Sequence, residues 1–374
     1  MIRVLNVISD TNIGGAGRVL LNYMSRADRE HFDVSVAMPR GSLLKQPLEE
    51  LGTTVYEVDG LTDRSYHKDD VKELEQLIGQ VQPDIVHTHG ALSGRIAGRR
   101  CGKVVIYTRH SAFPVPAKLK YPPGRWVNKF LNEYYSDHII AVSPAAAENL
   151  TDAGISKKHI TVMMNGVTPV QRKSPEETAA LREQWGVQDG EFVLGILARI
   201  EPYKGHLHIL EAMKQLTDEG RSLRLLVAGV GTYEQELRQQ AQDMGIAERV
   251  SFMGFQTDVA GVLSMLDLQL NASYGTETSS LSILEGLSMG LPAVVSTYGG
   301  NPWLIDDGQD GLLFENRNSA HLARCIAQLM DQPDTLAAMG QRAVEIFHQR
   351  FTAEIFAQNI ENVYYKAMEE MRHE

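Results

Sequence analysis

Two glutamates with seven residues between them, Glu277 and Glu285, flank a stretch rich in serine and threonine. Glu277 is expected in a loop at the carboxyl end of a strand, and Glu285 about one turn into the next helix, at ~3.6 residues per turn. Between them, the backbone N–H groups of Ser280, Leu281 and Ser282 would form a helix N-terminus that stabilises a phosphate. One carboxylate on each side of a phosphate site is the arrangement that a nucleotide sugar needs, because each carboxylate can accept hydrogen bonds from a diol, one on the ribose and one on the sugar. Taken alone, the spacing fits two solvated surface charges better.

Two cations in loop 198–205 change that balance. This loop is expected between a strand and a helix, so Arg199 and Lys204 fall near a strand end. Arginine binds a diphosphate through paired hydrogen bonds and lysine binds it as a point charge, so both side chains are candidates to hold one. Three further candidates follow later strands, and the last is a place for a base to lie against the backbone: Gly229, Gly231 and Phe255.

Polar residues also end three expected strands of the first half, at 12–15, 87–90 and 109–111. In open parallel sheets, ligands lie at the carboxyl ends of the strands. His87 is expected to be a neutral core residue, because it precedes the loop and should point into packing. For His89 a packed and a functional role are equally compatible with the sequence, and His110 is expected to be functional.

The elements that must position these residues repeat a strand–helix–strand pattern through both halves, which predicts an α/β fold with parallel sheets. Residues 52–58 are expected to be a short strand near a sheet edge. The polar segment 168–175 carries two prolines and predicts the domain boundary. We therefore expect an N-terminal domain of residues 1–167 and a C-terminal domain of residues 168–351.

Composition narrows the functional classes. The chain has 374 residues and a net charge of -11, which argues against a general nucleic-acid binder. Its two cysteines, Cys101 and Cys325, form no Cys-x-x-Cys motif, so we expect reduced thiols in a cytoplasmic protein and no bound metal. No apolar run reaches the ~18 residues of a membrane span.

Residues 95–132 depart from the acidic average, because they hold nine Lys and Arg residues and no Asp or Glu, with Tyr121, Trp126 and Phe130 interleaved. Such a stretch suits an anionic membrane surface or a phosphorylated acceptor. A solvated basic face with its aromatic residues in the local core is equally compatible. The first interpretation would place the protein peripherally at the inner face of a membrane.

The order of these motifs resembles the retaining glycosyltransferases of family 4, which have the GT-B fold. The resemblance runs from end to end of the chain and rests on six motifs: Gly14-Gly15, Arg109-His110, Asn-Gly-Val at 165–167, Arg199 with Lys204-Gly205, Gly229 with Gly231, and Glu277 with Glu285. It implies two Rossmann-like domains facing each other across a cleft. It also implies that the final helix, residues 352–374, packs back on the N-terminal domain.

The resemblance further implies the roles of single residues. Glu285 would bind the ribose hydroxyls, Glu277 the hydroxyls of the donor sugar, and Arg199 and Lys204 the diphosphate. Gly15 would give the phosphates a close backbone approach, and His110 would lie by the sugar at the reaction centre. The N-terminal domain would hold the acceptor, for which the candidate residues are Asn12, Arg18, His89 and Arg109.

Two departures from the family pattern affect the donor site. The family often has Gly-Phe-Gly after the first glutamate, where this chain has Thr278-Ser279-Ser280, so larger side chains crowd the sugar pocket. After Gly299-Gly300 the family usually has a glutamate within a few residues, and here Trp303 stands near that place.

The expected activity is a retaining transfer of a sugar, without metal or cofactor, from a nucleotide sugar to a hydroxyl of a lipid-linked or membrane-associated glycan. UDP is the expected carrier because it is the most frequent in the family. Three alternatives remain: a soluble acceptor, a sugar-nucleotide epimerase of the same fold, and a binding protein without catalysis.

Overall fold

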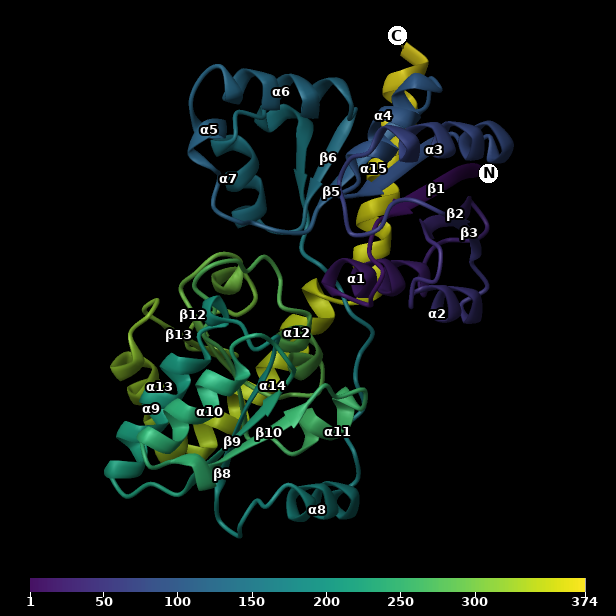
Figure 1. Cartoon of the computed structure of the whole chain (residues 1–374). Coiled ribbons are helices and arrows are strands. Elements are labelled where there is room, and N and C mark those ends of the chain that lie inside the picture. Colours follow the sequence, from purple (N-terminus) through teal and green to yellow (C-terminus); the bar gives the residue numbers. More distant parts are fainter. Residues whose placement is uncertain (374) are drawn as a thin grey trace. The chain divides into compact units, whose positions relative to one another are not determined.

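The computed structural model describes residues 1–373, which form two compact units (Figure 1). Unit 1 comprises residues 1–167 and 351–373, and unit 2 comprises Thr168–Arg350. The first boundary lies where the sequence places it, and the second lies one residue earlier. Each unit is described by itself below.

Unit 1 is a seven-stranded parallel sheet with helices on its faces. Its strands are β1 (Ile2–Ile8), β2 (Phe32–Pro39), β3 (Thr54–Val58), β4 (Ile85–His89), β5 (Val104–Arg109), β6 (His138–Ala141) and β7 (Ile160–Val162). Its helices are α1 (Gly15–Met24), α2 (Lys45–Glu50), α3 (Lys68–Val81), α4 (Leu92–Arg100), α5 (Ala117–Lys120), α6 (Gly124–Tyr134), α7 (Pro144–Asp152) and α15 (Ala353–His373).

The strand order in unit 1 is β3-β2-β1-β4-β5-β6-β7, so β3 lies at an edge as expected. Strand β1 pairs with β2 on one side and β4 on the other, and the direction of chain progress reverses there. In open parallel sheets, a ligand crevice lies beyond the carboxyl ends of the two strands at such a reversal. The segments after Ile8 and His89 therefore occupy the expected ligand-binding edge.

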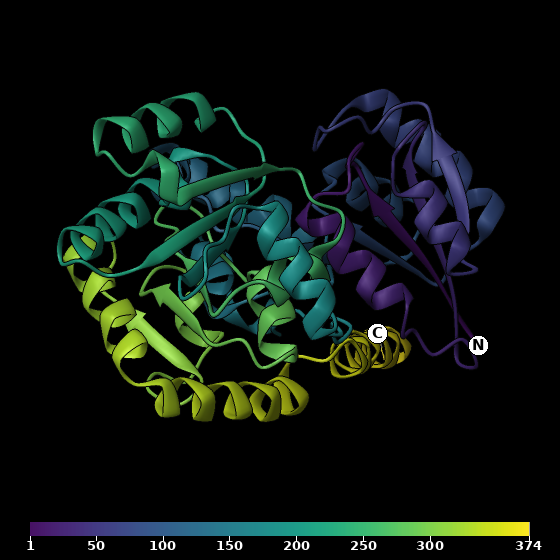
Figure 2. The same ribbon diagram turned by 90° about the horizontal axis from the view of Figure 1, so that it is seen from below.

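The final helix, α15, belongs to unit 1, which confirms the expectation that it packs on the first domain (Figure 2). Its Tyr364 lies edge-on to Tyr23 of α1, with ring centroids 6.2 Å apart, and its hydroxyl lies 2.7 Å from Nδ1 of His87 in β4. Glu361 accepts a hydrogen bond from the backbone N–H of Asp28 at 2.8 Å. Residues far apart in the chain thus complete one core.

Unit 2 is a six-stranded parallel sheet of order β10-β9-β8-β11-β12-β13. Its strands are β8 (Phe192–Leu197), β9 (Leu223–Ala228), β10 (Val250–Gly254), β11 (Leu268–Asn271), β12 (Ala293–Ser296) and β13 (Gly311–Phe314). Its helices are α8 (Pro175–Gln184), α9 (His206–Asp218), α10 (Glu234–Asp243), α11 (Val259–Ser264), α12 (Leu281–Ser288), α13 (Ser319–Asp331) and α14 (Pro333–Arg350).

Successive residues of β8 point to opposite faces of this sheet, and each face has its own core. Leu194 and Ile196 pack with α9, α10 and α13, whereas Val193 packs with α8 and α11. Strand β8 pairs with β9 and with β11, so the strand order reverses between β8 and β11. The loops after Leu197 and Asn271 therefore meet at the ligand edge of unit 2.

Two details differ from the sequence expectations. Residues 87–89 were expected partly in a loop, but β4 continues through His89, because β1 and β5 pair with it on both sides up to that residue. Helix α8 was not expected within the region next to the boundary. Its start was detectable, since Ser174 and Glu177 form a capping box.

Candidate functional site

The site in unit 2 begins where β8 ends. The backbone continues to pair beyond the strand, with Ala198 N–H donating to Ala228 O at 3.1 Å. Glycine is required opposite this segment, because a Cβ at Gly229 would lie 2.0 Å from Ala198 O, and one at Gly231 would lie 2.1 Å from Ile200 O. Both glycines are therefore packed against the loop that carries the cations.

Arg199 and Lys204 leave this loop in different environments. Arg199 is exposed, and its Nη2 donates a 3.1 Å hydrogen bond to the hydroxyl of Tyr203. Lys204 ends the short 3-10 helix η2 (Pro202–Lys204) and is largely buried. Gly205 then starts α9 at φ 75°, where a Cβ would lie 2.0 Å from Ala272 O, so this turn also needs glycine.

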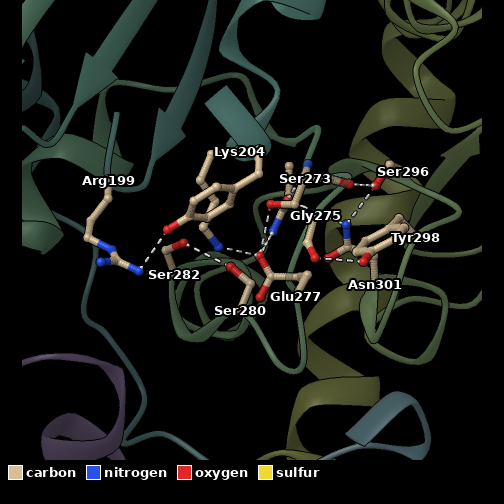
Figure 3. A network of polar contacts seen from close by, with 12 residues as sticks. Arg199, Lys204, Ser273, Gly275, Glu277, Ser280, Ser282, Ser296, Tyr298 and Asn301 are labelled. Atoms are coloured by element: carbon tan, nitrogen blue, oxygen red, sulfur yellow. Dashed lines mark hydrogen bonds and ion pairs between the residues drawn. The ribbon is translucent and has the colours of Figure 1, made fainter. Parts of the chain in front are cut away.

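Glu277 is the centre of a buried polar network (Figure 3). Its Oε2 accepts from Lys204 Nζ at 2.9 Å, from Asn271 Nδ2 at 3.1 Å and from Ser273 Oγ at 3.0 Å. Burial raises the pKa of this carboxyl, but the Lys204 ammonium and the three hydrogen bonds outweigh it, so the pKa lies below its ordinary value of 4.5. The residue is thus a fixed carboxylate, not a solvated surface charge.

The loop that carries Glu277 is held from the side of β12. Ser296 donates through Oγ to Ser273 O at 2.7 Å, and the Tyr298 hydroxyl donates to Gly275 O at 2.8 Å (Figure 3). The backbone N–H of Gly300 donates to Glu277 O at 3.0 Å. A Cβ at Gly300 would lie 1.6 Å from Thr278 O, so the two segments pack backbone against backbone.

Helix α12 begins beside this loop. Ser280 is its N-cap residue, its Oγ lies 3.1 Å from Ser282 Oγ, and Ser282 donates to Leu197 O at 3.1 Å. The backbone N–H groups of the first helical turn have no intrahelical acceptor, so they are available to an anion. Leu281 is buried, and Glu285 lies one turn further along, 7% exposed.

The triplet that replaces Gly-Phe-Gly is packed into the loop. Thr278 and Ser279 are 8% and 7% exposed. The buried Oγ of Ser279 has no hydrogen-bond partner among the described residues. A polar group of this kind next to Glu277 is available to bond a polar group of a ligand.

Phe255 follows β10 and is 72% exposed, so a planar ligand has access to its ring. In unit 1, Asn12 and Gly15 are also exposed, and Arg18 is half-buried in α1. A Cβ at Gly15 would meet nothing within 4 Å, which leaves open space over the start of α1. Among residues 1–373, no group of three or more His, Cys, Asp or Glu is placed to hold a metal ion.

Three histidines and an asparagine share one face of the unit 1 sheet. His89 Nε2 lies 3.0 Å from Asn6 Oδ1, and His89 Nδ1 lies 2.9 Å from His110 Nε2. With the Asn6 amide in this orientation, its oxygen only accepts, so neutral His89 carries its proton on Nε2 and accepts from His110 Nε2–H. The row leaves Nδ1 of His110 as the unprotonated nitrogen.

His89 lies in the packed interior of unit 1. It is 6% exposed, and its ring nitrogens lie 3.0 Å from Asn6 Oδ1 and 2.9 Å from His110 Nε2, so it is placed to orient the His110 ring. A contact of His89 with an acceptor stays a prediction. His87 is a core residue, as expected, bonded to Tyr364 and Thr108. Burial and then Arg109 lower the pKa of His110 to about 4, which keeps this ring neutral at neutral pH.

Arg109 is held by its own unit. Its Nε donates to Ser111 O at 2.8 Å and its Nη2 to Asn149 Oδ1 at 3.1 Å.

The candidate residues from the sequence do not include some of those that hold Glu277 and His89 in place. For Asn6 a signal was present, since it is a polar residue inside a run of apolar strand residues, whereas nothing in the sequence marks Asn271 or Ser273.

Two sequence-family models match this chain. A sequence model described as Glycosyl transferases group 1 matches residues 177–345, and one described as Glycosyltransferase Family 4 matches residues 13–171. EpsD of Bacillus subtilis (strain 168), which carries the name of a glycosyltransferase, is 29% identical over 285 residues, covering 72% of this chain and 73% of its own length.

A second relative is the UDP-Gal:alpha-D-GlcNAc-diphosphoundecaprenol alpha-1,3-galactosyltransferase of Escherichia coli, 25% identical over 334 residues and covering 85% of both chains. Among solved structures, HepE from Anabaena in complex with UDP superposes with a TM-score of 0.84 at 23% identity, covering 98% of this chain and 100% of its own. The chain thus shares its fold with a solved structure over nearly its whole length.

Proposed function

Starting from the fact that this chain belongs to the family 4 glycosyltransferases with the GT-B fold, we propose that it transfers a sugar from a nucleotide sugar to an acceptor hydroxyl with retention of configuration. Unit 2 binds the donor and unit 1 binds the acceptor. The observation that carries this proposal is the buried Lys204–Glu277 pair beside the first turn of α12, where the strand order reverses.

The donor is bound along this edge in three parts. Arg199, Lys204 and the N–H groups at Ser280–Ser282 hold the diphosphate, and the close packing of Gly229 and Gly231 on loop 198–205 keeps Arg199 in place beside it. Glu285 binds the ribose hydroxyls, and Phe255 lies by the base. Oε2 of Glu277 is engaged by three protein donors, so we assign its other oxygen to the hydroxyls of the sugar.

The acceptor oxygen attacks the anomeric carbon from the side of the leaving diphosphate. The bond between that carbon and the phosphate oxygen breaks, and a phosphate oxygen of the donor takes the proton of the acceptor hydroxyl. Negative charge grows on the diphosphate, where Arg199, Lys204 and the helix N-terminus stabilise it, and one such fixed donor is worth ~3 kcal/mol or more. The proposal requires neither metal nor cofactor.

Glu277 and His110 have supporting roles in this reaction. Glu277 is bound by three donors with a lowered pKa, which makes it a fixed acceptor and a weak nucleophile. Trapping of a covalent sugar adduct on Glu277 would overturn this assignment. His110 is neutral at neutral pH, so it acts as a hydrogen-bonding group toward the sugar and not as a general acid.

UDP is the proposed carrier of the sugar. Support comes from the names of the similar proteins, since HepE was solved with UDP and the relative from Escherichia coli is named for UDP-Gal. The sugar itself is a hexose or an N-acetylhexosamine. The side chains of Thr278 and Ser279, which replace glycine and phenylalanine of the family pattern, contribute to its selection.

The proposed acceptor is a glycan on a lipid carrier, reached at the inner face of a membrane. The similar enzyme from Escherichia coli is named for an acceptor linked to diphosphoundecaprenol. Helix α6 exposes Trp126, Val127 and Phe130, which are 66%, 55% and 58% accessible, next to basic residues of the same segment. None of the helices described is both long and apolar enough to cross a bilayer.

The donor site is tested by a thermal-shift screen of UDP-, GDP- and ADP-sugars, with and without EDTA. A ligand at a hundred times its Kd should stabilise the fold by ~2.7 kcal/mol. We expect a shift with a UDP-sugar that persists in EDTA and is lost in Glu285→Ala. Glu248→Ala, an exposed glutamate of the same unit, is the matched control and should keep the shift.

The alternatives give different outcomes. No shift with any nucleotide sugar would contradict the donor site as assigned. Turnover of the donor without acceptor, into an isomer of the sugar, would indicate an epimerase. No binding of wild type to anionic vesicles would favour a soluble acceptor. Binding that is lost on charge reversal at Lys118, Lys120, Arg125 and Lys129 would favour a membrane-associated one.

A further inference from the structure

Unit 1 contains a cavity of about 390 Å³ beside the carboxyl ends of β4 and β5, where Gly90 and Arg109 line it. Its other walls come from α4, α6, α7 and the segment before α5. Much of the lining is aliphatic: Leu92, Leu119, Leu131, Leu150 and Ile155. Two arginines, Arg95 and Arg109, also line it, and among the described residues the lining includes no carboxylate.

Arg95 is a buried cation without an anionic partner in the described part of the chain. It is 6% exposed, its Nη1 donates to Asn132 Oδ1 at 2.8 Å, and its guanidinium lies 4.2 Å above the ring of Tyr107. Its buried Nε has no hydrogen-bond partner within residues 1–373. Burying a cation with neutral partners alone is costly, because the lost hydration is not replaced by an opposite charge.

Arg109 adds a second cation to the same cavity. Its Nη1 lies 3.4 Å from the hydroxyl of Tyr107, so the two guanidinium groups approach one tyrosine from its ring and its hydroxyl. Burial lowers the pKa of Arg95, and Arg109 lowers it further, against an opposing effect of Tyr107. An anion between the two arginines would offset the burial of the Arg95 charge and the repulsion between the two cations. Guanidinium groups bind phosphate through paired hydrogen bonds.

The cavity lies under the exposed apolar face of α6. Asn128, Leu131 and Asn132 of this helix line the cavity, whereas Trp126 and Phe130 point away from it and are exposed. Asn128 donates to Ala153 O at 2.8 Å and thereby joins α6 to the end of α7. The aliphatic wall and the outer aromatic face together suit a ligand with an apolar chain.

We propose that this cavity binds a phosphate group that carries an aliphatic chain, with the phosphate on Arg95 and Arg109 and the chain along the leucine wall. A lipid-linked acceptor and a membrane phospholipid share this chemistry. We commit to the acceptor, because the diphosphate that joins its lipid to its glycan carries more charge than a phosphodiester. Only this choice rests on the proposed function, because binding to the cavity is measured without any donor.

The test is calorimetric titration of the full chain with water-soluble probes. Octyl diphosphate should bind saturably, and octanol, octyltrimethylammonium and inorganic phosphate should each bind at least tenfold more weakly. Dihexanoylphosphatidylglycerol stands for the phospholipid. If it binds more tightly than octyl diphosphate, the acceptor is the wrong source.

Arg95→Met supplies the matched variant, because methionine keeps an unbranched chain and removes the buried charge. It should lose at least tenfold in affinity for octyl diphosphate, or 1.4 kcal/mol, while the thermal shift with UDP-sugar is unchanged. Arg100→Met, an exposed arginine of the same helix paired with Glu75, should bind like wild type. If Arg95→Met does not fold, Arg95→Lys is used and should be weakened in the same direction.

Equal binding of octyl diphosphate and octanol by wild type would overturn the proposal without any variant. Equal affinity in the folded Arg95 variant and wild type would overturn it as well. A failure of UDP-sugar binding in wild type would contradict the proposed function and leave this result standing on its own.

Discussion

At the scale of single residues, the sequence predicts positions better than partners. The spacing of Glu277 and Glu285 correctly predicts a loop carboxylate and a helical one. The ion pair of Glu277 with Lys204 joins residues 73 positions apart, and no local pattern encodes such a contact. The same holds for the row from Asn6 through His89 to His110, whose members come from neighbouring strands and not from neighbouring positions.

Replacing Glu277 by glutamine should destabilise the protein by ~2 kcal/mol, below the range for fully buried pairs, because Lys204 loses its carboxylate and remains 16% exposed. Urea unfolding at pH 7 measures this. Glu234→Gln, which breaks a surface pair with Arg238 one turn away, is the control and should cost ~0.5 kcal/mol or less. Equal losses in the two variants would contradict the assigned role of the buried pair.

The same pair predicts a pH dependence. The pKa of Glu277 is lower in the folded protein than its ordinary value of 4.5, so the unfolded chain binds the proton more readily. The stabilisation is therefore complete above pH 4.5 and is lost as the pH falls through the folded pKa. Unfolding free energies of wild type and Glu277→Gln should converge below pH 4.5. Parallel curves down to pH 3 would contradict this.

The buried His87 should make the free energy of unfolding depend on pH in a higher range. Burial and then His110 lower its pKa from 6.5 to about 3, so the unfolded chain takes up a proton near pH 6.5 that the folded protein does not. Stability should fall as the pH drops from 6.5 toward 4, by up to ~1.4 kcal/mol per pH unit from this group. His87→Gln should show a smaller slope over this range, measured by denaturant unfolding at each pH.

At the scale of elements, the type and order of the strands and helices were largely predictable from the sequence. The burial of the loops between them was not. The strand–helix–strand pattern correctly predicts parallel sheets, and the short edge strand expected at 52–58 and the helix of Glu285 are both present as β3 and α12. The stretch 272–280 was expected to be a polar loop at a strand end, yet most of it is buried, because the glycines after β12 pack onto it. Most of its serines and threonines are buried within the site. Composition alone does not distinguish such a buried polar loop from an exposed one.

Gly300→Ala should therefore displace this loop. Its Cβ would lie 1.6 Å from Thr278 O, and backbone on both sides leaves no flexible side chain to move. We expect a loss of ~2 kcal/mol in stability, typical of a strained core substitution, and at least a tenfold weaker Kd for the UDP-sugar. Gly79→Ala in α3, where a Cβ meets nothing within 4 Å, should instead stabilise the fold by ~0.5–1 kcal/mol.

At the scale of the whole molecule, the chain builds unit 1 from both of its ends and unit 2 from its middle. The resemblance of the sequence to a known family predicted this return. Val167 N–H donates to Phe351 O at 2.9 Å, and Ala353 N–H donates to Val167 O at 3.0 Å. The two points where the chain leaves and re-enters unit 1 are thus bonded to each other.

Residues 168–350 expressed alone should fold cooperatively, because they contain a complete six-stranded sheet with a core on each face. Residues 1–167 alone should not, since α15 covers His87 and Tyr23. Joining residues 351–373 to residue 167 through a flexible linker is the control and should restore folding. Circular dichroism during thermal unfolding measures all three, and cooperative unfolding of 1–167 alone would contradict the prediction.

The position of Tyr364 also has a consequence for synthesis on the ribosome. Domains generally fold in the order in which they emerge, at ~5–20 residues per second. Here the first sheet to be translated cannot bury His87 until α15 leaves the exit tunnel, about 200 residues after β7, which takes roughly 10–40 seconds at that rate. By the end of this interval all six strands of the second unit have been made, whereas the first unit still lacks the helix that covers His87. The N-terminal sheet is therefore the part of the chain that most needs a chaperone during synthesis, although it is made first.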